Sequence, residues 1–199
     1  MDAPLRPLSQ IASIQAGIPF LVSDSVDEGE LVFIPSALRG DDEMMPDDSM
    51  VQPATLLVSA EDKYRLQAQD ILLTAKATPT TLRCGYLAAG WSKPWFFAAN
   101  LIRVQADSSK IHPRFLHAWF CYPEGRAALI GCSQSTTGQL NLTASSLAEV
   151  MVPVPPLKEQ MKAVEILQVA AIARRNAIAA AESRMILARE IAFNPPITQ

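Results

Sequence analysis

The segment that most constrains this chain is a proline-rich apolar stretch that leads into a long helix-forming sequence. Residues 150–157 read VMVPVPPL and are followed by Lys158, Glu159 and Gln160. Each proline lacks a backbone N–H donor and disfavours helical geometry in the residue before it. We therefore expect an edge strand or extended connector that starts a helix, with Pro156 near the first turn, where proline is tolerated.

One long helix is predicted from about Leu157 to Ala192. This stretch contains no glycine or proline, is rich in good helix formers, and ends before Asn194 and two prolines. With a rise of 1.5 Å per residue, such a helix is roughly 50 Å long. A domain of this size cannot cover that length, so we expect part of the helix to pair with another helix; the alternative is a helix folded back on its own domain. A heptad-like series predicts the interface: Met161, Val164, Leu167, Ala171, Ile178 and Met185.

The rest of the chain has short apolar runs separated by turn residues, a pattern typical of strands. We predict strands at 31–34, 54–59, 70–75, 84–89 and 95–104, a strand or short helix at 8–16, and helices at 113–122 and 124–130. The fold class is therefore α+β, with a mixed-sheet domain over residues 1–155 and a helical spacer or dimerisation region over residues 156–199. At period two, Trp91, Trp95 and Phe97 would share one sheet face. We predict that they are core residues; the alternative is a base-stacking platform.

Charge is distributed unevenly. Residues 1–60 contain ten acidic and two basic residues, whereas residues 61–199 contain ten acidic and fifteen basic ones. A basic face toward a phosphate backbone is thus compatible with the net charge of −3; the alternative is two solvated acidic loops without a partner. No apolar run approaches the ~20 residues of a membrane span, the N-terminus lacks a secretion signal, and three cysteines are too few for a disulfide framework. We expect a cytoplasmic protein.

Two polar loops are candidates for contact with nucleic acid. Hydroxyl, amide and cationic side chains bind phosphates and base edges, so both loops have suitable chemistry, although ordinary surface loops have the same composition. The predicted contact residues are Lys76, Thr78, Thr80, Thr81 and Arg83 in the first loop, Ser135, Thr136, Thr137, Gln139 and Asn141 in the second, and Lys93 between two tryptophans.

Other reactive residues form no recognisable catalytic set. His112 and His117, with Cys121, are the candidate metal ligands. The two histidines are five positions apart, which does not place them on one helical face, so no metal site is predicted. The tetrapeptide NPPI at 194–197 is similar to the Asn-Pro-Pro-aromatic loop of adenine-N6 methyltransferases, but isoleucine replaces the stacking aromatic. Since no glycine-rich turn follows a strand, we expect no cofactor in this chain.

Several segments resemble the specificity subunits of type I restriction–modification systems. LAEVMVPVPPLKEQ (147–160) resembles the end of their target-recognition domain, where a "lPlPpl-EQ" strand passes into a conserved helix. In chain order, LSQIASIQAG (8–17) looks like the family's opening, YRLQAQDILLT (64–74) like its "l--gDil-t" strand, and NLIRV (100–104) with IHPRFL (111–116) like its strand-to-helix step. The loop before the final strand retains the family's glycine, at Gly138, but lacks its usual basic residues.

This resemblance implies a half-size specificity subunit with one target-recognition domain and one conserved helix. Such a chain would be non-catalytic: it would read one half-site of double-stranded DNA and dock methyltransferase subunits, which bind S-adenosylmethionine, together with a restriction motor subunit for cleavage. Pairing of two chains in a homodimer would restore a bipartite reader. The alternative is an assembly or adaptor module of the same fold that does not read DNA.

Overall fold

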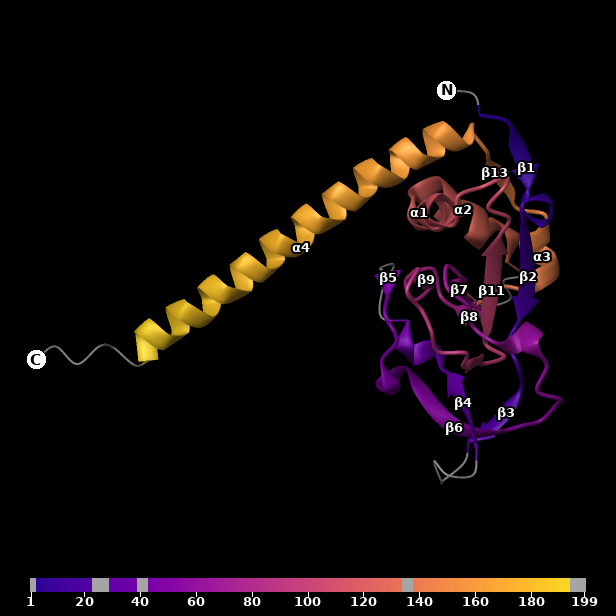
Figure 1. Cartoon of the computed structure of the whole chain (residues 1–199), viewed down its shortest axis with the longest axis horizontal. Helices are drawn as coiled ribbons and strands as arrows, with labels where there is room; N and C mark the ends of the chain where they lie inside the picture. The colour runs from indigo at the N-terminus through magenta and orange to yellow at the C-terminus, as the bar shows by residue number, and fades with distance from the viewer. Residues whose placement is uncertain (1–2, 23–28, 39–42, 134–137, 194–199) are drawn as a thin grey trace, which may run out of the picture. The chain divides into compact units, whose positions relative to one another are not determined.

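The computed structural model describes residues 3–22, 29–38, 43–133 and 138–193 (Figure 1). It divides into two units, Met1–Gln160 and Met161–Gln199. The first unit contains short strands and short helices, and a long C-terminal helix follows. This arrangement confirms the predicted α+β class with a terminal helix.

The strands are short and form mixed sheets. A five-stranded sheet has the order β2-β11-β7-β9-β5, a four-stranded sheet has the order β10-β4-β6-β3, and β1-β13 and β12-β8 form two-stranded sheets. Pairing is antiparallel except between β10 and β4 and between β5 and β9. The strand bounds are β1 (Leu5–Pro7), β2 (Ala12–Ala16), β3 (Phe20–Val22), β4 (Glu30–Phe33), β5 (Glu43–Met44), β6 (Val51–Leu56), β7 (Ile71–Thr74), β8 (Lys76–Ala77), β9 (Cys84–Leu87), β10 (Phe96–Phe97), β11 (Leu101–Ala106), β12 (Leu140–Asn141) and β13 (Met151–Pro153).

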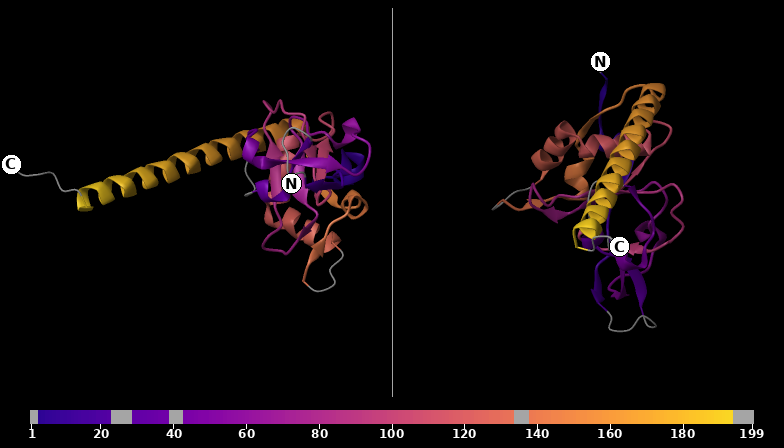
Figure 2. Two further views of the ribbon diagram at one scale, coloured as in Figure 1. Left: turned by 90° about the horizontal axis from the view of Figure 1, so that it is seen from below. Right: turned by 90° about the vertical axis from the view of Figure 1, so that its left-hand side faces the viewer.

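The α-helices are α1 (Pro113–Cys121), α2 (Pro123–Cys132), α3 (Ala144–Ala148) and α4 (Leu157–Phe193). Short 3₁₀ turns are η1 (Leu8–Gln10), η3 (Pro35–Ala37), η4 (Asp48–Met50) and η5 (Asp62–Tyr64). Helix α4 is continuous over its 37 residues (Figure 2), which confirms the helix predicted from the sequence. No helix in the described ranges is long and apolar enough to cross a membrane.

Two hydrophobic clusters hold the first unit together, and strand β7 contributes to both. Ile71 and Leu73 point into a cluster with α1, α2 and α3, whereas Leu72 points into a cluster built around Phe33 and Trp91. Alternate residues of a strand face opposite sides, so β7 is buried on both faces. Figure 1 shows α1 and α2 at one end of the unit, β3, β4 and β6 at the other, and the β7–β9–β11 sheet between them.

The predicted strand at 95–104 is wrong in one respect, because it is two strands in different sheets. Strand β10 pairs with β4, and after a turn β11 pairs with β2 and β7. Gly17 explains the break: its N–H donates to the Leu101 carbonyl at 3.0 Å, and a Cβ at position 17 would lie 2.0 Å from the Ala98 carbonyl oxygen. The backbone at the crossover is too close for any side chain there.

A buried ion pair connects two neighbouring strands of the five-stranded sheet, β7 and β11. Arg103 of β11 and Asp70, just before β7, are both almost completely buried, with Nη1 and Oδ2 3.8 Å apart. Arg103 Nη1 also donates to the Arg65 carbonyl at 2.6 Å, and Asp70 Oδ2 accepts from the Gln67 N–H at 2.8 Å. Asp70 Oδ1 and Arg103 Nε have no hydrogen-bond partner among the described residues. Burial raises the pKa of Asp70 to about 7, since desolvation outweighs the nearby positive charge of Arg103.

The proline-rich segment forms the predicted edge strand. Strand β13 pairs antiparallel with β1, and the neighbouring bonds Leu8 N–H to Val150 O (2.8 Å) and Val154 N–H to Pro4 O (2.9 Å) extend the pairing. Prolines are tolerated here because β13 has only one partner strand.

Gln160 anchors the start of α4. Its side chain is fully buried. Its Nε2 donates to the carbonyls of Pro155 (2.7 Å) and Lys110 (3.3 Å), and its Oε1 accepts from the His112 N–H at 2.7 Å. One amide thus joins the connector, the first turn of α4 and the entrance of α1, which gives a physical reason for glutamine at the end of the PPLKEQ segment.

Replacing Gln160 with alanine should lower the free energy of unfolding by about 2–4 kcal/mol, because the substitution leaves a buried N–H and two carbonyls without a partner. Urea denaturation of the whole chain measures the change. Glu159→Ala, one residue earlier and exposed, is the matched control and should change the free energy by less than about 0.5 kcal/mol. Equal effects of the two substitutions would show that the Gln160 bonds contribute nothing.

Candidate nucleic-acid interface

Strands β8 and β12 bring the two predicted polar loops together. They pair antiparallel, with Ala77 opposite Leu140 and Lys76 opposite Asn141. Ala77 and Leu140 are buried in the first hydrophobic cluster, whereas Lys76 and Asn141 are exposed. Because paired residues of an antiparallel ladder share a face, Lys76 and Asn141 lie directly opposite each other on the outer side. Two loops about sixty residues apart in the chain therefore form one surface.

The first loop is a compact turn held by its own hydroxyl groups. The Thr78 N–H donates to Thr81 Oγ1 at 2.8 Å, the Thr81 N–H donates to Thr78 Oγ1 at 3.2 Å, and the two hydroxyls lie 2.9 Å apart. Thr80 Oγ1 lies 3.0 Å from Thr78 Oγ1. All three threonines are exposed, so the loop is a preformed surface that offers hydroxyl groups.

Arg83 has a structural role in this turn. Its Nη1 donates to the carbonyls of Thr80 (2.8 Å) and Leu82 (3.3 Å), and its side chain is partly buried. Arg126 of α2 donates to the same Leu82 carbonyl at 2.9 Å. Lys76, in contrast, is exposed and makes no ion pair among the described residues. Lys76 is therefore the cation of this loop that is available to a phosphate.

The second loop is anchored at both sides of β12. Gly138 has a left-handed backbone (φ 78°), and the Leu142 N–H donates to the Ala75 carbonyl at 2.8 Å. Thr143 then caps α3, accepting from the Ser146 N–H at 3.0 Å. Gln139, two residues before Asn141, is also exposed. The predicted contacts Ser135, Thr136 and Thr137 lie outside the described residues.

Lys93 lies in another part of the unit. Its ammonium group is 5.9 Å from the centre of the Trp95 ring, and its carbonyl accepts from the Trp91 indole N–H at 2.7 Å. Trp91, Trp95 and Phe97 are buried in the second cluster, which confirms that they are core residues. Among the described strands, none pairs this segment with β8 or β12. Lys93 therefore lies beside residues of the second cluster, whereas the two loops predicted with it flank strands of the first cluster.

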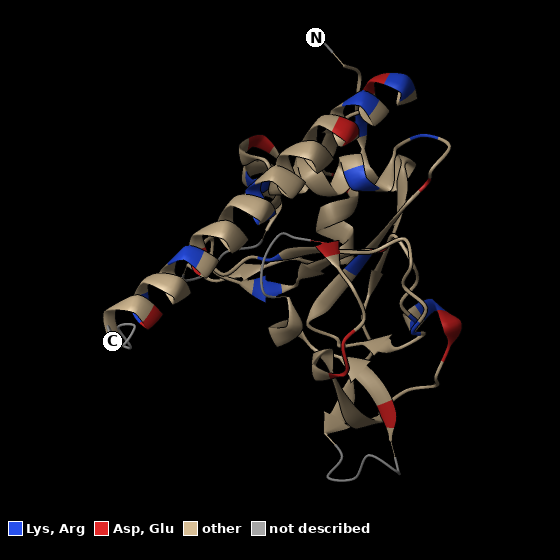
Figure 3. Ribbon diagram, turned by 60° about the vertical axis from the view of Figure 1, so that its left-hand side comes forward, with Lys and Arg blue, Asp and Glu red and all other residues tan. Residues whose placement is uncertain are grey.

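Three other cations of the first unit are paired with acids. Lys63 lies 2.8 Å from Glu61, Lys110 lies 2.8 Å from Asp107, and Arg114 contacts Glu43. Figure 3 shows basic and acidic positions interspersed over the ribbons of the described residues instead of a continuous basic band. On the described residues, a phosphate backbone would therefore meet local cations such as Lys76 and neutral polar groups.

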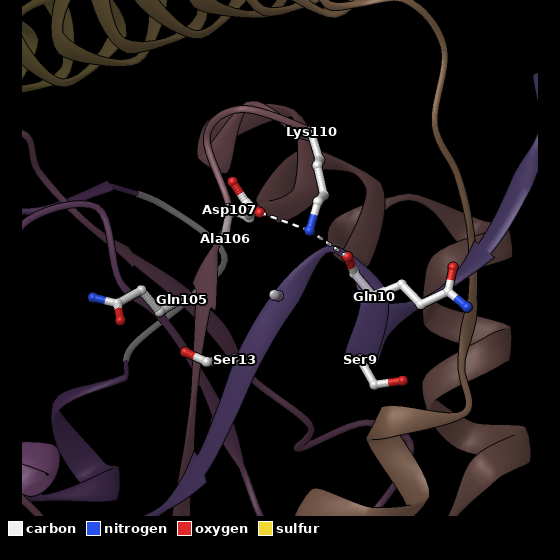
Figure 4. A pocket seen from close by; sticks show the side chains of 8 residues that line it. Ser9, Gln10, Ser13, Gln105, Ala106, Asp107 and Lys110 are labelled. Carbon is white, nitrogen blue, oxygen red and sulfur yellow. Dashed lines mark hydrogen bonds and ion pairs between the residues drawn. The ribbon is translucent and has the colours of Figure 1, made fainter.

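A separate pocket of about 390 Å³ lies beside strands β2 and β11 (Figure 4). Its polar lining includes Gln10, Ser13, Gln105, Asp107 and Lys110. Lys110 donates to the Gln10 carbonyl at 3.1 Å and forms an ion pair with Asp107. The Asp107 carboxylate therefore compensates the positive charge of Lys110 within the pocket. The hydrogen bond from Lys110 lowers the pKa of Asp107 to about 2. None of the predicted DNA contacts that lie among the described residues lines this pocket.

The predicted interface residues all lie on α4. Met161, Leu167, Ala171, Ile178 and Met185 are exposed, and Val164 is buried. Ile166 and Val169 are also exposed, at 69% and 68%. Since successive helical residues are about 100° apart, Ile166, Leu167 and Val169 point in three directions. The helix is thus apolar on more than the single predicted seam.

Comparison with known proteins identifies the family. The family model of the type I restriction modification DNA specificity domain matches residues 10–178, most of this chain. The chain belongs to this family. A curated specificity-domain relative, the type I restriction enzyme EcoKI specificity subunit of Escherichia coli K12, is 26% identical over 105 residues, which are 52% of this chain and 22% of that protein.

Solved structures of specificity subunits share the fold. The HsdS subunit from Thermoanaerobacter tengcongensis matches with a TM-score of 0.55 and 15% identity, covering 100% of this chain and 51% of that one. The type I S subunit from M. genitalium matches with 0.58 and 15%, covering 95% and 44%. A chain from a study of type I R-M complex assembly and conformational transition matches with 0.58 and 20%, covering 93% and 43%. This specificity domain therefore spans about half the length of these relatives, or less.

Proposed function

We propose that this chain is the DNA-recognition component of a type I restriction–modification system and reads one half-site of double-stranded DNA. Residues 1–155 act as the target-recognition domain and residues 156–199 as the spacer. The observation that carries the proposal is the β8–β12 pairing, which puts the exposed Lys76, Asn141, Gln139 and the threonine turn on one surface. Lysine contacts phosphates, while asparagine and glutamine read base edges.

The proposed assembly depends on α4. A helix whose apolar side chains point in several directions needs more than one helical neighbour to cover them. A second copy of the chain and a methyltransferase subunit would together provide such neighbours, and the homodimer would pair two half-site readers. The chain itself supplies no catalytic group in this scheme. S-adenosylmethionine would bind to the methyltransferase subunits, and a motor subunit would add cleavage, all in the cytoplasm.

Lys76→Glu tests the proposed DNA surface. We expect it to weaken binding of duplex DNA by about tenfold or more at low salt, because it replaces a phosphate-binding cation with a repelling charge, and to make binding less sensitive to salt. Fluorescence anisotropy with the whole chain, alone and with its methyltransferase subunit, measures the change. Arg83→Glu is a poorer probe, since Arg83 also holds the turn.

Lys63→Glu is the matched control, because it makes the same charge change at an exposed lysine of η5. We expect less than about a threefold effect, as long-range charge is screened by salt. If wild-type protein binds no duplex with or without the methyltransferase subunit, the reading role is wrong. In that case the adaptor alternative would account for the lack of basic residues around Gly138.

A further inference from the structure

Two cysteines and one histidine converge between strand β9 and helix α1. Cys84 starts β9, and His117 and Cys121 lie one helical turn apart on α1. Cys84 Sγ, Cys121 Sγ and the nearest ring nitrogen of His117 all lie within 4.8 Å of one another. His117 Nε2 is 3.5 Å from Cys121 Sγ and 3.3 Å from the Cys84 carbonyl oxygen. The i, i+4 spacing of His117 and Cys121 puts both side chains on one helical face.

These distances suit a tetrahedral metal ion. With metal–sulfur bonds of about 2.3 Å and a metal–nitrogen bond of about 2.0 Å, the edges of a tetrahedron are roughly 3.5–3.8 Å. The separation of 3.5 Å between His117 Nε2 and Cys121 Sγ already equals such an edge. The remaining separations are at most 4.8 Å, so they need to shorten by up to about an ångström to reach a tetrahedral edge.

We propose that Cys84, His117 and Cys121 bind one Zn²⁺ ion, with a water molecule as the fourth ligand. Thiolate and imidazole ligands in tetrahedral geometry select zinc over the oxygen-preferring Mg²⁺ and Ca²⁺. On binding, each cysteine releases its thiol proton to solvent. His117 Nε2 exchanges its 3.3 Å contact with the Cys84 carbonyl for the metal: the imidazole takes the tautomer with its proton on Nδ1, and Nε2 gives its lone pair to the ion. Two thiolates neutralise the charge of the cation, which suits a site with two buried ligands.

The accessible side of the site is at Cys121. Cys84 and His117 are buried, whereas Cys121 is partly exposed at the end of α1. A metal ion and its water can therefore enter beside Cys121. Because one ligand comes from β9 and two come from α1, the ion would fasten this helix to the central sheet, and binding would stabilise the folded domain.

The test uses the whole chain, purified with a phosphine reductant and without metal. Titration with Co²⁺, a spectroscopic substitute for zinc, should produce the thiolate charge-transfer band and the intense visible bands of tetrahedral cobalt, with one equivalent bound. Addition of Zn²⁺ should remove these bands and raise the melting temperature. Absence of the bands, together with no zinc-induced rise in the melting temperature, would overturn the proposal.

Matched cysteine variants locate the ion. Cys121→Ser should weaken metal binding at least tenfold and abolish the charge-transfer band or reduce it to that of one thiolate. Cys132→Ser removes a thiol that lies outside the cluster and should bind like wild type. Equal loss in both variants would show that the ion binds elsewhere. Circular dichroism confirms folding of each variant, and His117→Ala, which leaves both thiols in place, should also lose tight binding.

Discussion

Arg103→Met should lower the free energy of unfolding by about 3–5 kcal/mol at alkaline pH, because it leaves the buried Asp70 carboxylate without its cation. The substitution also removes the 2.6 Å hydrogen bond to the Arg65 carbonyl and the contact of the guanidinium with the Phe97 ring. Methionine fills much of the same volume, so loss of packing contributes less than loss of charge compensation.

The pH dependence of this penalty follows from Asp70. Its folded pKa of about 7 is above the ordinary 3.8, so the folded state holds a proton that the unfolded state has lost, and stability falls as the pH rises from about 4 to about 7. Without Arg103 the folded pKa rises further, and the fall continues to higher pH. The penalty of Arg103→Met should therefore be smallest at about pH 5 and grow as the pH rises through 7.

Urea denaturation of wild type and variant across this pH range measures the effect. The double variant Asp70→Asn/Arg103→Met removes the isolated charge as well and should regain more than about half of the lost stability at alkaline pH. A penalty that is the same at both ends of the range, or a double variant no more stable than the single one, would contradict the assigned charge pairing.

Ile178→Asp or Leu167→Asp should abolish assembly through α4. Both residues are exposed apolar side chains in the series predicted from the sequence. If another helix covers them in the complex, aspartate would place an uncompensated charge in that interface and weaken binding by about 100-fold or more. The unfolding midpoint of the Met1–Gln160 unit should stay unchanged, because the substitutions lie in the other unit.

Light scattering reports self-association, and co-purification reports docking to the methyltransferase subunit. Ser183→Asp adds the same charge to α4 at an exposed polar position and should leave assembly intact. If wild-type protein is monomeric, homodimerisation is wrong. If neither aspartate variant affects docking, the partner contacts another surface.

The sequence predicted the local elements that have strong local causes. The proline-rich edge strand and the long helix follow from missing N–H donors and from the run of helix formers between Pro156 and Asn194. The strands β4, β7 and β9 follow from short apolar runs, with bounds shifted by a residue or two. The split of residues 95–104 was not predictable, because it depends on the close approach of Gly17, some eighty positions earlier in the chain.

The composition of the candidate sites was harder to predict from the sequence than the helices and strands were, because folding decides which residues meet. Sequence composition indicated two polar loops but not that β8 and β12 join them, nor that Lys93 belongs to the other hydrophobic cluster. The proposed zinc site was missed because the candidate set of His112, His117 and Cys121 was rejected on the spacing of the two histidines. His112 is not part of the cluster: it caps α1, accepting from the Arg114 N–H. The spacing of His117 and Cys121 was a usable signal, and only the fold adds Cys84.

What the sequence alone determined is the order of the elements, the family and the long C-terminal helix, since these depend on residues that are neighbours in the chain. The tertiary structure decided which distant residues meet: Lys76 with Asn141, Asp70 with Arg103, and Cys84 with His117. The physical reason is that pairing of strands and burial of charge are non-local. Their free energy depends on partners brought together by folding, and a single sequence does not record those partners.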